Sequence, residues 1–350
     1  MRPAASELFA HGVGGRADLP IPAALAFLGA AAALLVSFAV LAFAWRSPRF
    51  RGDDSGRALP SWLARVVDSP LTRAVLVITA LLFAGWVSMA AVFGSDTLVN
   101  PTFGSVYVLL WVGLVPAAIL FGHLYRLCNP LRWLHCGLSR LAGTDPTSGV
   151  RQYPAALGYW PAAGLLFAFV WLELVDPAIA QDLSAVRLWF AIVAALTLMG
   201  AAVYGDTWFE HGDPFEVYSS LVARLSPFGR RTDKTPVVRN PLENLDGLRA
   251  KPGLVAVVAV LFGSTGFDSF KDSSRWLGFS QQYTEHATLL NTTALLTFCL
   301  AVYVTFVATS VATGGIGHIA DVRRRDLPDL MAHSVVPIVV GYVVAHYLSF

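Results

Sequence analysis

YGDTWFEHGDPFEVYSSLVARLSPFGRR, residues Tyr204–Arg231, closes an apolar run and carries a dense cluster of polar side chains. An earlier stretch has the same pattern, because Leu124–Leu141 (LYRLCNPLRWLHCGLSRL) aligns without gaps with Trp208–Leu225. The alignment pairs Asn129 with Asp213, and a proline follows each of them, as is typical of a helix N-cap and first turn. Both stretches are therefore predicted to be short amphipathic helices that lie along the inner membrane surface.

The two stretches indicate a duplicated helical hairpin, covering residues 74–141 and 158–225. Apolar residues follow helical spacing in both copies: Leu131, Leu134, Leu138 and Leu141, and Phe215, Tyr218, Val222 and Leu225. The first inner loop holds a weaker counterpart, Leu59–Ser69. The alternative is that any inner loop with a cap, a proline and an apolar stripe would align in this way. A true duplication would be of the parallel kind known among transporters.

The composition is that of a membrane protein. With 55% hydrophobic and 14% charged residues, the chain is too apolar for an ordinary soluble domain of 350 residues. The formal net charge of +2 gives no reason to expect nucleic acid as a partner. We expect the lipid bilayer as partner, with a homo-oligomer or a partner membrane subunit as further options. The three cysteines cannot form a paired disulfide framework and are expected to be free thiols.

Eight apolar runs are predicted to be membrane-spanning helices, each of which needs roughly 20 residues. They are approximately Ala23–Trp45, Ala74–Phe93, Ser105–Leu124, Gly158–Val175, Ala185–Gly205, Leu254–Phe270, Thr288–Thr313 and Ser334–Phe350. The predicted fold is all-α: a polytopic integral membrane protein with short cytoplasmic amphipathic helices, forming a single membrane domain over residues 1–350.

The distribution of Lys and Arg predicts the orientation. Alternate connections between the predicted helices hold twenty of the 25 basic residues, and the positive-inside rule makes those connections cytoplasmic. The N-terminus is then outside, in a bacterial inner membrane. The first run is predicted to be a retained helix, since it is too long and too strongly followed by arginines for a cleaved signal peptide. The last run stops at Phe350 after about sixteen residues, so we expect a truncated C-terminus.

Polar side chains gather at the inner ends of the third and fifth predicted helices. His, Cys and carboxylate groups are common metal ligands, so a divalent metal is conceivable, but no CxxC, HxH or HExxH pattern supports one. In the alternative interpretation, Asp213 caps a helix and its neighbours are solvated, which leaves Glu210 and His211 without a structural role. The candidate inner cluster comprises Glu210, His211, Asp206 and His123.

The sixth predicted helix is unusual because its clean apolar run, Leu254–Phe262, is too short to span a bilayer. Gly263 and Gly266 are predicted to break it at membrane depth, where irregular backbone is tolerated only beside protein or a water-filled cavity. We therefore predict an outer pocket here. The alternative is that Ser264–Trp276 is an extracellular loop after a shallow helix. The candidate pocket comprises Ser264, Thr265, Asp268, Asn291, Thr292, Glu173, His346, His11 and His286.

Three segments carry a resemblance to a known family: HGVGGRADLPIP (His11–Pro22), CNPLRW (Cys128–Trp133) and FEVYSSLVARLSPFGRR (Phe215–Arg231). Over its length the chain resembles bacterial polytopic membrane proteins labelled fenitrothion hydrolase. The resemblance implies a membrane-bound enzyme that hydrolyses an organophosphate triester, and it carries over no catalytic residues.

Three functions are open on this basis. The first is the hydrolase, although phosphotriester hydrolysis usually needs a metal-activated water and the eight histidines are scattered singly. The second is a small-solute or ion transporter or permease with its site at the broken sixth helix. The third is a subunit of a larger membrane complex. No nucleophile elbow, P-loop or dinucleotide-binding motif occurs in the chain.

Overall fold

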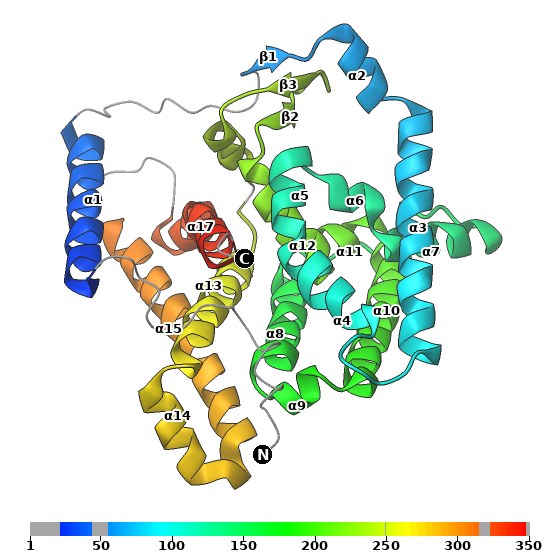
Figure 1. Cartoon of the computed structure of the whole chain (residues 1–350). Helices are drawn as coiled ribbons and strands as arrows, with labels where there is room; N and C mark the ends of the chain where they lie inside the picture. The colour runs from blue at the N-terminus through cyan, green and yellow to red at the C-terminus, as the bar shows by residue number, and fades with distance from the viewer. Residues whose placement is uncertain (1–21, 44–54, 249, 315–322, 348–350) are drawn as a thin grey trace.

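The computed structural model describes residues 22–43, 55–248, 250–314 and 323–347, and these residues are almost entirely helical (Figure 1). The helices are α1 (Ala23–Phe43), α2 (Ser61–Val67), α3 (Pro70–Phe93), α4 (Pro101–Phe103), π-helix η1 (Gly104–Val112), α5 (Leu114–Phe121), α6 (Leu124–Cys128), α7 (Pro130–Leu141), α8 (Trp160–Leu174), α9 (Pro177–Ala180), α10 (Leu183–Tyr204), α11 (Asp206–His211), α12 (Pro214–Val222), η2 (Ala223–Leu225), η3 (Pro241–Gly247), α13 (Leu254–Lys271), α14 (Ser274–Ser280), η4 (Gln281–His286), α15 (Ala287–Thr313), η5 (Arg324–Asp326), α16 (Leu327–Met331), η6 (Ala332–Val335) and α17 (Val336–Tyr347).

Within the described ranges, five helical segments are long and apolar enough to cross a membrane. They are Pro70–Phe93, Leu183–Tyr204, Leu254–Lys271, Ser274–Thr313 and Arg324–Ala345. A sixth is present if α4–η1 and α5 form one bent span. Two shorter apolar helical segments, Phe27–Val40 within α1 and Trp160–Leu174 (α8), have 10–17 residues. The chain is therefore an all-α membrane protein, while eight spans remain a prediction.

The third predicted span is the one that breaks. The helical segments Pro101–Val112 and Leu114–Phe121 meet at 43°, and Gly113 N donates to Val108 O, a π-helical bond. Pro116 explains the bend, because proline has no N–H to donate to Val112 O and its ring crowds that carbonyl. The result is a discontinuous helix at membrane depth.

The predicted break in the sixth helix is wrong. Helix α13 is continuous from Leu254 to Lys271, and its glycines serve close packing instead. A Cβ on Gly263 would lie 2.6 Å from the Cα of Cys299 in α15, and one on Gly266 would lie 3.1 Å from the ring of Phe298. Small residues let neighbouring membrane helices approach closely. Gly263 therefore belongs to the α13–α15 interface.

Helix α12 lies inside the bundle, not along its surface as predicted. Most of its residues are buried, and it packs against α5, α6, α8 and α11 (Figure 1). Its counterpart α7 keeps the amphipathic character, with Leu134, Leu138 and Leu141 exposed. The two aligned helices therefore share an Asx N-cap, but α12 is mostly buried and α7 has an exposed apolar face.

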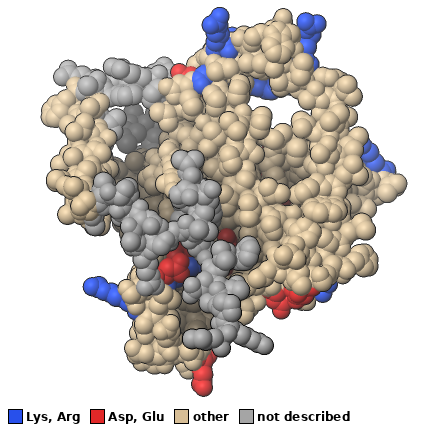
Figure 2. All heavy atoms as spheres, in the orientation of Figure 1, with Lys and Arg blue, Asp and Glu red and all other residues tan. Residues whose placement is uncertain are grey.

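A small antiparallel sheet, which the sequence patterns did not indicate, joins two of the basic connections. Its strands are β1 (Arg57–Ala58), β2 (Phe228–Arg230) and β3 (Pro236–Val238), in the order β1–β3–β2. Arg57 pairs with Val238, and Arg230 pairs with Pro236. Lys and Arg side chains gather over α2 and this sheet at one end of the molecule (Figure 2).

Candidate functional site

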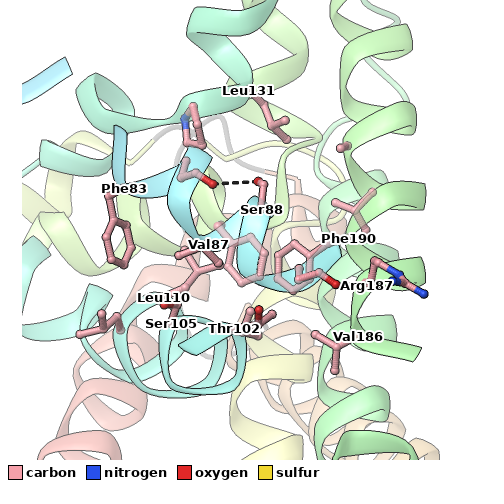
Figure 3. Close-up of a pocket in the computed structure, with 18 of the residues that line it drawn as sticks. Phe83, Val87, Ser88, Thr102, Ser105, Leu110, Leu131, Val186, Arg187 and Phe190 are labelled. Atoms are coloured by element: carbon pink, nitrogen blue, oxygen red, sulfur yellow. Dashed lines mark hydrogen bonds between the residues drawn. The ribbon is translucent and has the colours of Figure 1, made fainter. Parts of the chain in front are cut away.

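A pocket of about 540 Å³ lies between α3, the broken third span, α10 and the α6–α7 turn. Volumes of about 300–1,000 Å³ are usual for small-molecule sites. Side chains from α3, η1 and α10 converge on it, among them Val87, Leu110 and Phe190 (Figure 3). The lining residues of α3 extend from Ala80 to Val92, which is roughly 18 Å of helix at 1.5 Å per residue. The pocket is therefore elongated and follows the helix axes.

Most of the lining is apolar or aromatic, and a few polar groups interrupt it. Ser88 Oγ donates to Ala84 O at 2.8 Å, so this hydroxyl is used within its own helix. Thr102 is 3% exposed, and its Oγ1 finds no hydrogen-bond partner among the described residues. Buried hydroxyls are normally bonded. Thr102 therefore places an unsatisfied, buried hydroxyl in the wall of the pocket (Figure 3).

Asp213 and Phe215 line the pocket where it meets the start of α12. Asp213 Oδ1 accepts from the backbone N–H groups of Phe215 and Glu216, at 3.0 and 2.9 Å, so the predicted N-cap is confirmed. Its Oδ2 accepts from Asn129 Nδ2 at 3.0 Å. Asp213 makes no ion pair with a described residue, so it adds a negative charge to a lining that also holds one cation, Arg187.

An ion-pair network lies directly behind Asp213. Arg132 binds Glu216 through Nη2 and Asp206 through Nη1, both at 2.6 Å. The Glu216 side chain is 1% exposed, and its Oε2 also accepts from Asn129 Nδ2 at 3.0 Å. Two carboxylates thus bind one guanidinium, and with Asp213 beside them this end of the pocket is anionic.

Burial, followed by the charge of Glu216, raises the pKa of Asp213 to about 6. The backbone N–H of Glu216 and the side chain of Asn129 act in the opposite direction by hydrogen bonding to the carboxylate. Asp213 is therefore ionised above pH about 6 and neutral in more acidic solution.

The network also pairs the two aligned stretches residue by residue. Arg126 binds Glu210 at 2.7 Å, Asn129 binds Asp213, and Arg132 binds Glu216, and the partners are 84 residues apart in each case. These are the same positions that the sequence alignment places together. Contacts between equivalent residues are what a two-fold axis between two copies would produce.

The residues of the predicted inner cluster do not gather at one site, because Glu210 and Asp206 form ion pairs with different arginines. Glu210 binds Arg126 and Asp206 binds Arg132, and His123 is exposed at the start of α6. The expectation that Glu210 has no structural role is therefore wrong, because the ion pair with Arg126 ties α11 to α6.

His211 also has partners. Its Nδ1–H donates to Thr207 O at 2.9 Å, so Nε2 is left to accept from Lys251 Nζ at 2.6 Å. The rings of Tyr153 and Tyr159 pack against the imidazole. Burial lowers the pKa of His211, which keeps the ring neutral in this arrangement. The prediction that His211 has no structural role is wrong.

The residues of the predicted outer pocket form hydrogen bonds and an ion pair among α8, α13, α14 and α15. Ser264 and Thr265 donate to Leu261 O and Phe262 O within α13. Asn291 accepts from Trp276 Nε1 and donates to Val175 O, and Thr292 accepts from Trp171 Nε1, each at 2.8 to 2.9 Å. Asp268 pairs with Lys271 at 3.1 Å. None of these residues lines the pocket described above.

The remaining outer candidates differ in position. Glu173 is 8% exposed near the outer end of α8, and its Oε2 finds no hydrogen-bond partner in the described part of the chain. His286 is exposed and precedes α15. His346 belongs to α17, but its side chain lies outside the described residues, as does His11 altogether.

Among the residues that the structure describes, no group of three or more His, Cys, Asp or Glu side chains is placed to hold a metal ion. No family model matches the chain, and no match to a curated protein or a solved structure was found. The pocket was not predicted. Gly113 and Pro116, inside the third apolar run, indicate a broken helix, and residues of this run line the pocket.

Proposed function

We propose that the chain is a permease for amphipathic aromatic cations, which enter the pocket between α3, η1 and α10. The observation that carries the proposal is that an apolar, aromatic pocket meets both a discontinuous helix and a buried carboxylate, Asp213. Discontinuous helices commonly form the substrate sites of transporters, where irregular backbone lines a cavity.

The charge and shape of the pocket favour this class of solute. Phe83, Phe190 and Phe215 supply aromatic faces, which attract cations. Asp213 adds an unpaired negative charge where the pocket meets α12. An aromatic cation would satisfy both, whereas an anion would be repelled by Asp213.

We further propose that residues 74–141 and 158–225 are duplicated hairpins related by a two-fold axis through the three residue pairs 84 positions apart. In parallel-repeat transporters, alternating access comes largely from rocking of one repeat against the other. The bend at Gly113 places the flexible backbone beside the pocket, where such a movement would open or close it.

The membrane placement that accompanies this function is eight spans in a bacterial inner membrane, with the N-terminus outside. The asymmetry of Lys and Arg supports it, and it puts the sheet and α2 on the cytoplasmic side. The end of the pocket at Asp213 then lies toward the cytoplasm.

Ethidium uptake into proteoliposomes tests the proposal, because this aromatic cation fluoresces more strongly when bound to enclosed nucleic acid. Uptake should be saturable in the wild type. In Asp213→Asn, which keeps a capping oxygen but removes the charge, ethidium affinity should fall about tenfold, equivalent to ~1.4 kcal/mol. Wild-type uptake no faster than in protein-free vesicles would contradict the proposal.

Ethidium binding should also depend on pH through Asp213. The carboxylate is ionised above its pKa of about 6, and at one pH unit below that value only about a tenth of it is charged. Affinity measured by fluorescence titration should therefore fall about tenfold between neutral solution and pH 5. In Asp213→Asn this dependence should be absent, and an unchanged pH profile in that variant would assign the titration to another group.

A second candidate is the hydrolase that the family resemblance implies. The observation that favours it is the apolar lining of the pocket, which suits a neutral, lipophilic organophosphate triester. Purified protein should then release the nitrophenol leaving group from fenitrothion, measured by absorbance. Hydrolysis that Ala84→Trp leaves unchanged would place the reaction outside this pocket.

A further inference from the structure

We propose that Glu173 is a proton-binding site that couples a proton gradient to movement of the cation in the pocket. The coupling rests on the permease function proposed above, whereas proton binding by Glu173 does not. The site lies on the outer half of the molecule, at the end of α8, and nothing in the inner network contributes to it.

Several polar groups near Glu173 have hydrogen-bond partners, whereas Oε2 of Glu173 has none among the described residues. Trp171 and Thr292 bond to each other, Thr288 Oγ1 donates to Asp176 Oδ2 at 2.9 Å, and Asn291 bonds to Val175 O. Against this background, Oε2 of Glu173 is buried without a hydrogen-bond partner in the described residues. A bare carboxylate in an apolar environment is costly, so it is neutralised by a proton or by a cation.

Charged and titratable groups of α13 and η1 lie near Glu173. Asp268 and Lys271 of α13 both act on it electrostatically, and Tyr107 of η1 is close enough to feel its charge. Lys271 binds Asp268 at 3.1 Å, and Tyr342 of α17 lies on the far side of Asp268. Because Lys271 is paired with Asp268, the Glu173 carboxylate is left to be neutralised by a proton.

The π-helix η1 connects Glu173 to the pocket. Tyr107 faces the Glu173 side and its hydroxyl donates to Ala180 O at 2.9 Å, which anchors η1 to α9. Val106, Leu109 and Leu110 of the same helix line the pocket. Binding of a proton forms an O–H bond on the Glu173 carboxyl and removes a charge beside Tyr107. The same short, irregular helix therefore borders both the proton site and the solute site.

The experiment compares wild type, Glu173→Gln and the control Glu285→Gln, which removes an exposed carboxylate from η4 on the same side. With a gradient of one pH unit, exchange of one proton for one cation should sustain about a tenfold ethidium concentration ratio. Wild type and Glu285→Gln should show this accumulation. Glu173→Gln should let ethidium equilibrate without accumulating it. Accumulation by Glu173→Gln at the wild-type level would overturn the proposal.

A second measurement separates this inference from the permease function. Infrared difference spectra recorded during a pH titration should show the carbonyl band of a protonated, buried carboxylic acid. The band should be present in the wild type and in Glu285→Gln and missing in Glu173→Gln, with folding checked by gel filtration. If no variant moves ethidium but the band behaves in this way, the permease function fails and proton binding stands. A band that survives in Glu173→Gln would refute the site.

Discussion

Arg132→Ala is expected to destabilise the protein by about 3–5 kcal/mol, because it leaves buried charge without compensation. The guanidinium binds Glu216 and Asp206 at 2.6 Å and lies over the ring of Phe209, 4.6 Å from its centroid. Glu216 is 1% exposed, so water cannot replace the lost partner. The measurement is equilibrium unfolding in detergent micelles.

Arg126→Ala is the matched control. Arg126 of α6 and Glu210 of α11 form the corresponding pair six residues earlier, but their side chains are 48% and 38% exposed. Exposed ion pairs contribute about 0–1 kcal/mol. A loss in Arg132→Ala as small as that in Arg126→Ala would mean that the network behind Asp213 is solvated.

An exchange of the two partners tests the direct pairing of positions 132 and 216. Arg132→Glu or Glu216→Arg alone places like charges together and should be at least as damaging as Arg132→Ala. The double variant restores an ion pair across the axis and should recover part of the lost stability. Recovery is expected to be incomplete because Asp206 would then face a glutamate at position 132. A double variant no better than the sum of the singles would mean that positions 132 and 216 do not pair directly.

The second large effect is expected for Gly263→Ala. A methyl group at this position would lie 2.6 Å from Cys299 Cα and 2.8 Å from Cys299 N, so backbone, not a flexible side chain, has to move. Overpacking of this kind costs about 1–3 kcal/mol. The measurement is again unfolding in micelles, with the separation of α13 and α15 checked by disulfide cross-linking.

Gly164→Ala in α8 supplies the comparison, since nothing lies within 4 Å of the added methyl group. Alanine favours a helix over glycine by up to about 1 kcal/mol, so this variant should be neutral or more stable. If Gly263→Ala were equally harmless, the close contact between α13 and α15 would be wrong, and the broken sixth helix would have to be reconsidered.

The sequence was a good guide to elements whose cause is local. Asn129 and Asp213 cap their helices as predicted, because an Asx side chain followed by proline satisfies its own helix N-terminus. The long apolar runs became long helices for a similar reason. The alignment at a spacing of 84 residues also identified pairs that contact each other, as in Arg132 and Glu216.

The remaining features depend on partners that are distant in sequence. Helix α12 is buried because Arg132 neutralises Glu216, and no periodicity within residues 214–222 indicates that. Gly263 resembles a helix breaker until Cys299 of α15 is placed beside it. The pocket forms because α3, η1 and α10 do not pack tightly against one another. Only the bend, which Gly113 and Pro116 cause, could be predicted from the local sequence.

Ethidium uptake by a pocket-filling variant tests the central claim most directly. Ala84 lines the pocket, whereas Leu82, two residues away on α3, is 70% exposed and does not line it. Ala84→Trp should abolish saturable uptake, and Leu82→Trp should leave it at the wild-type rate. Equal uptake in the two variants would contradict a solute path through this pocket.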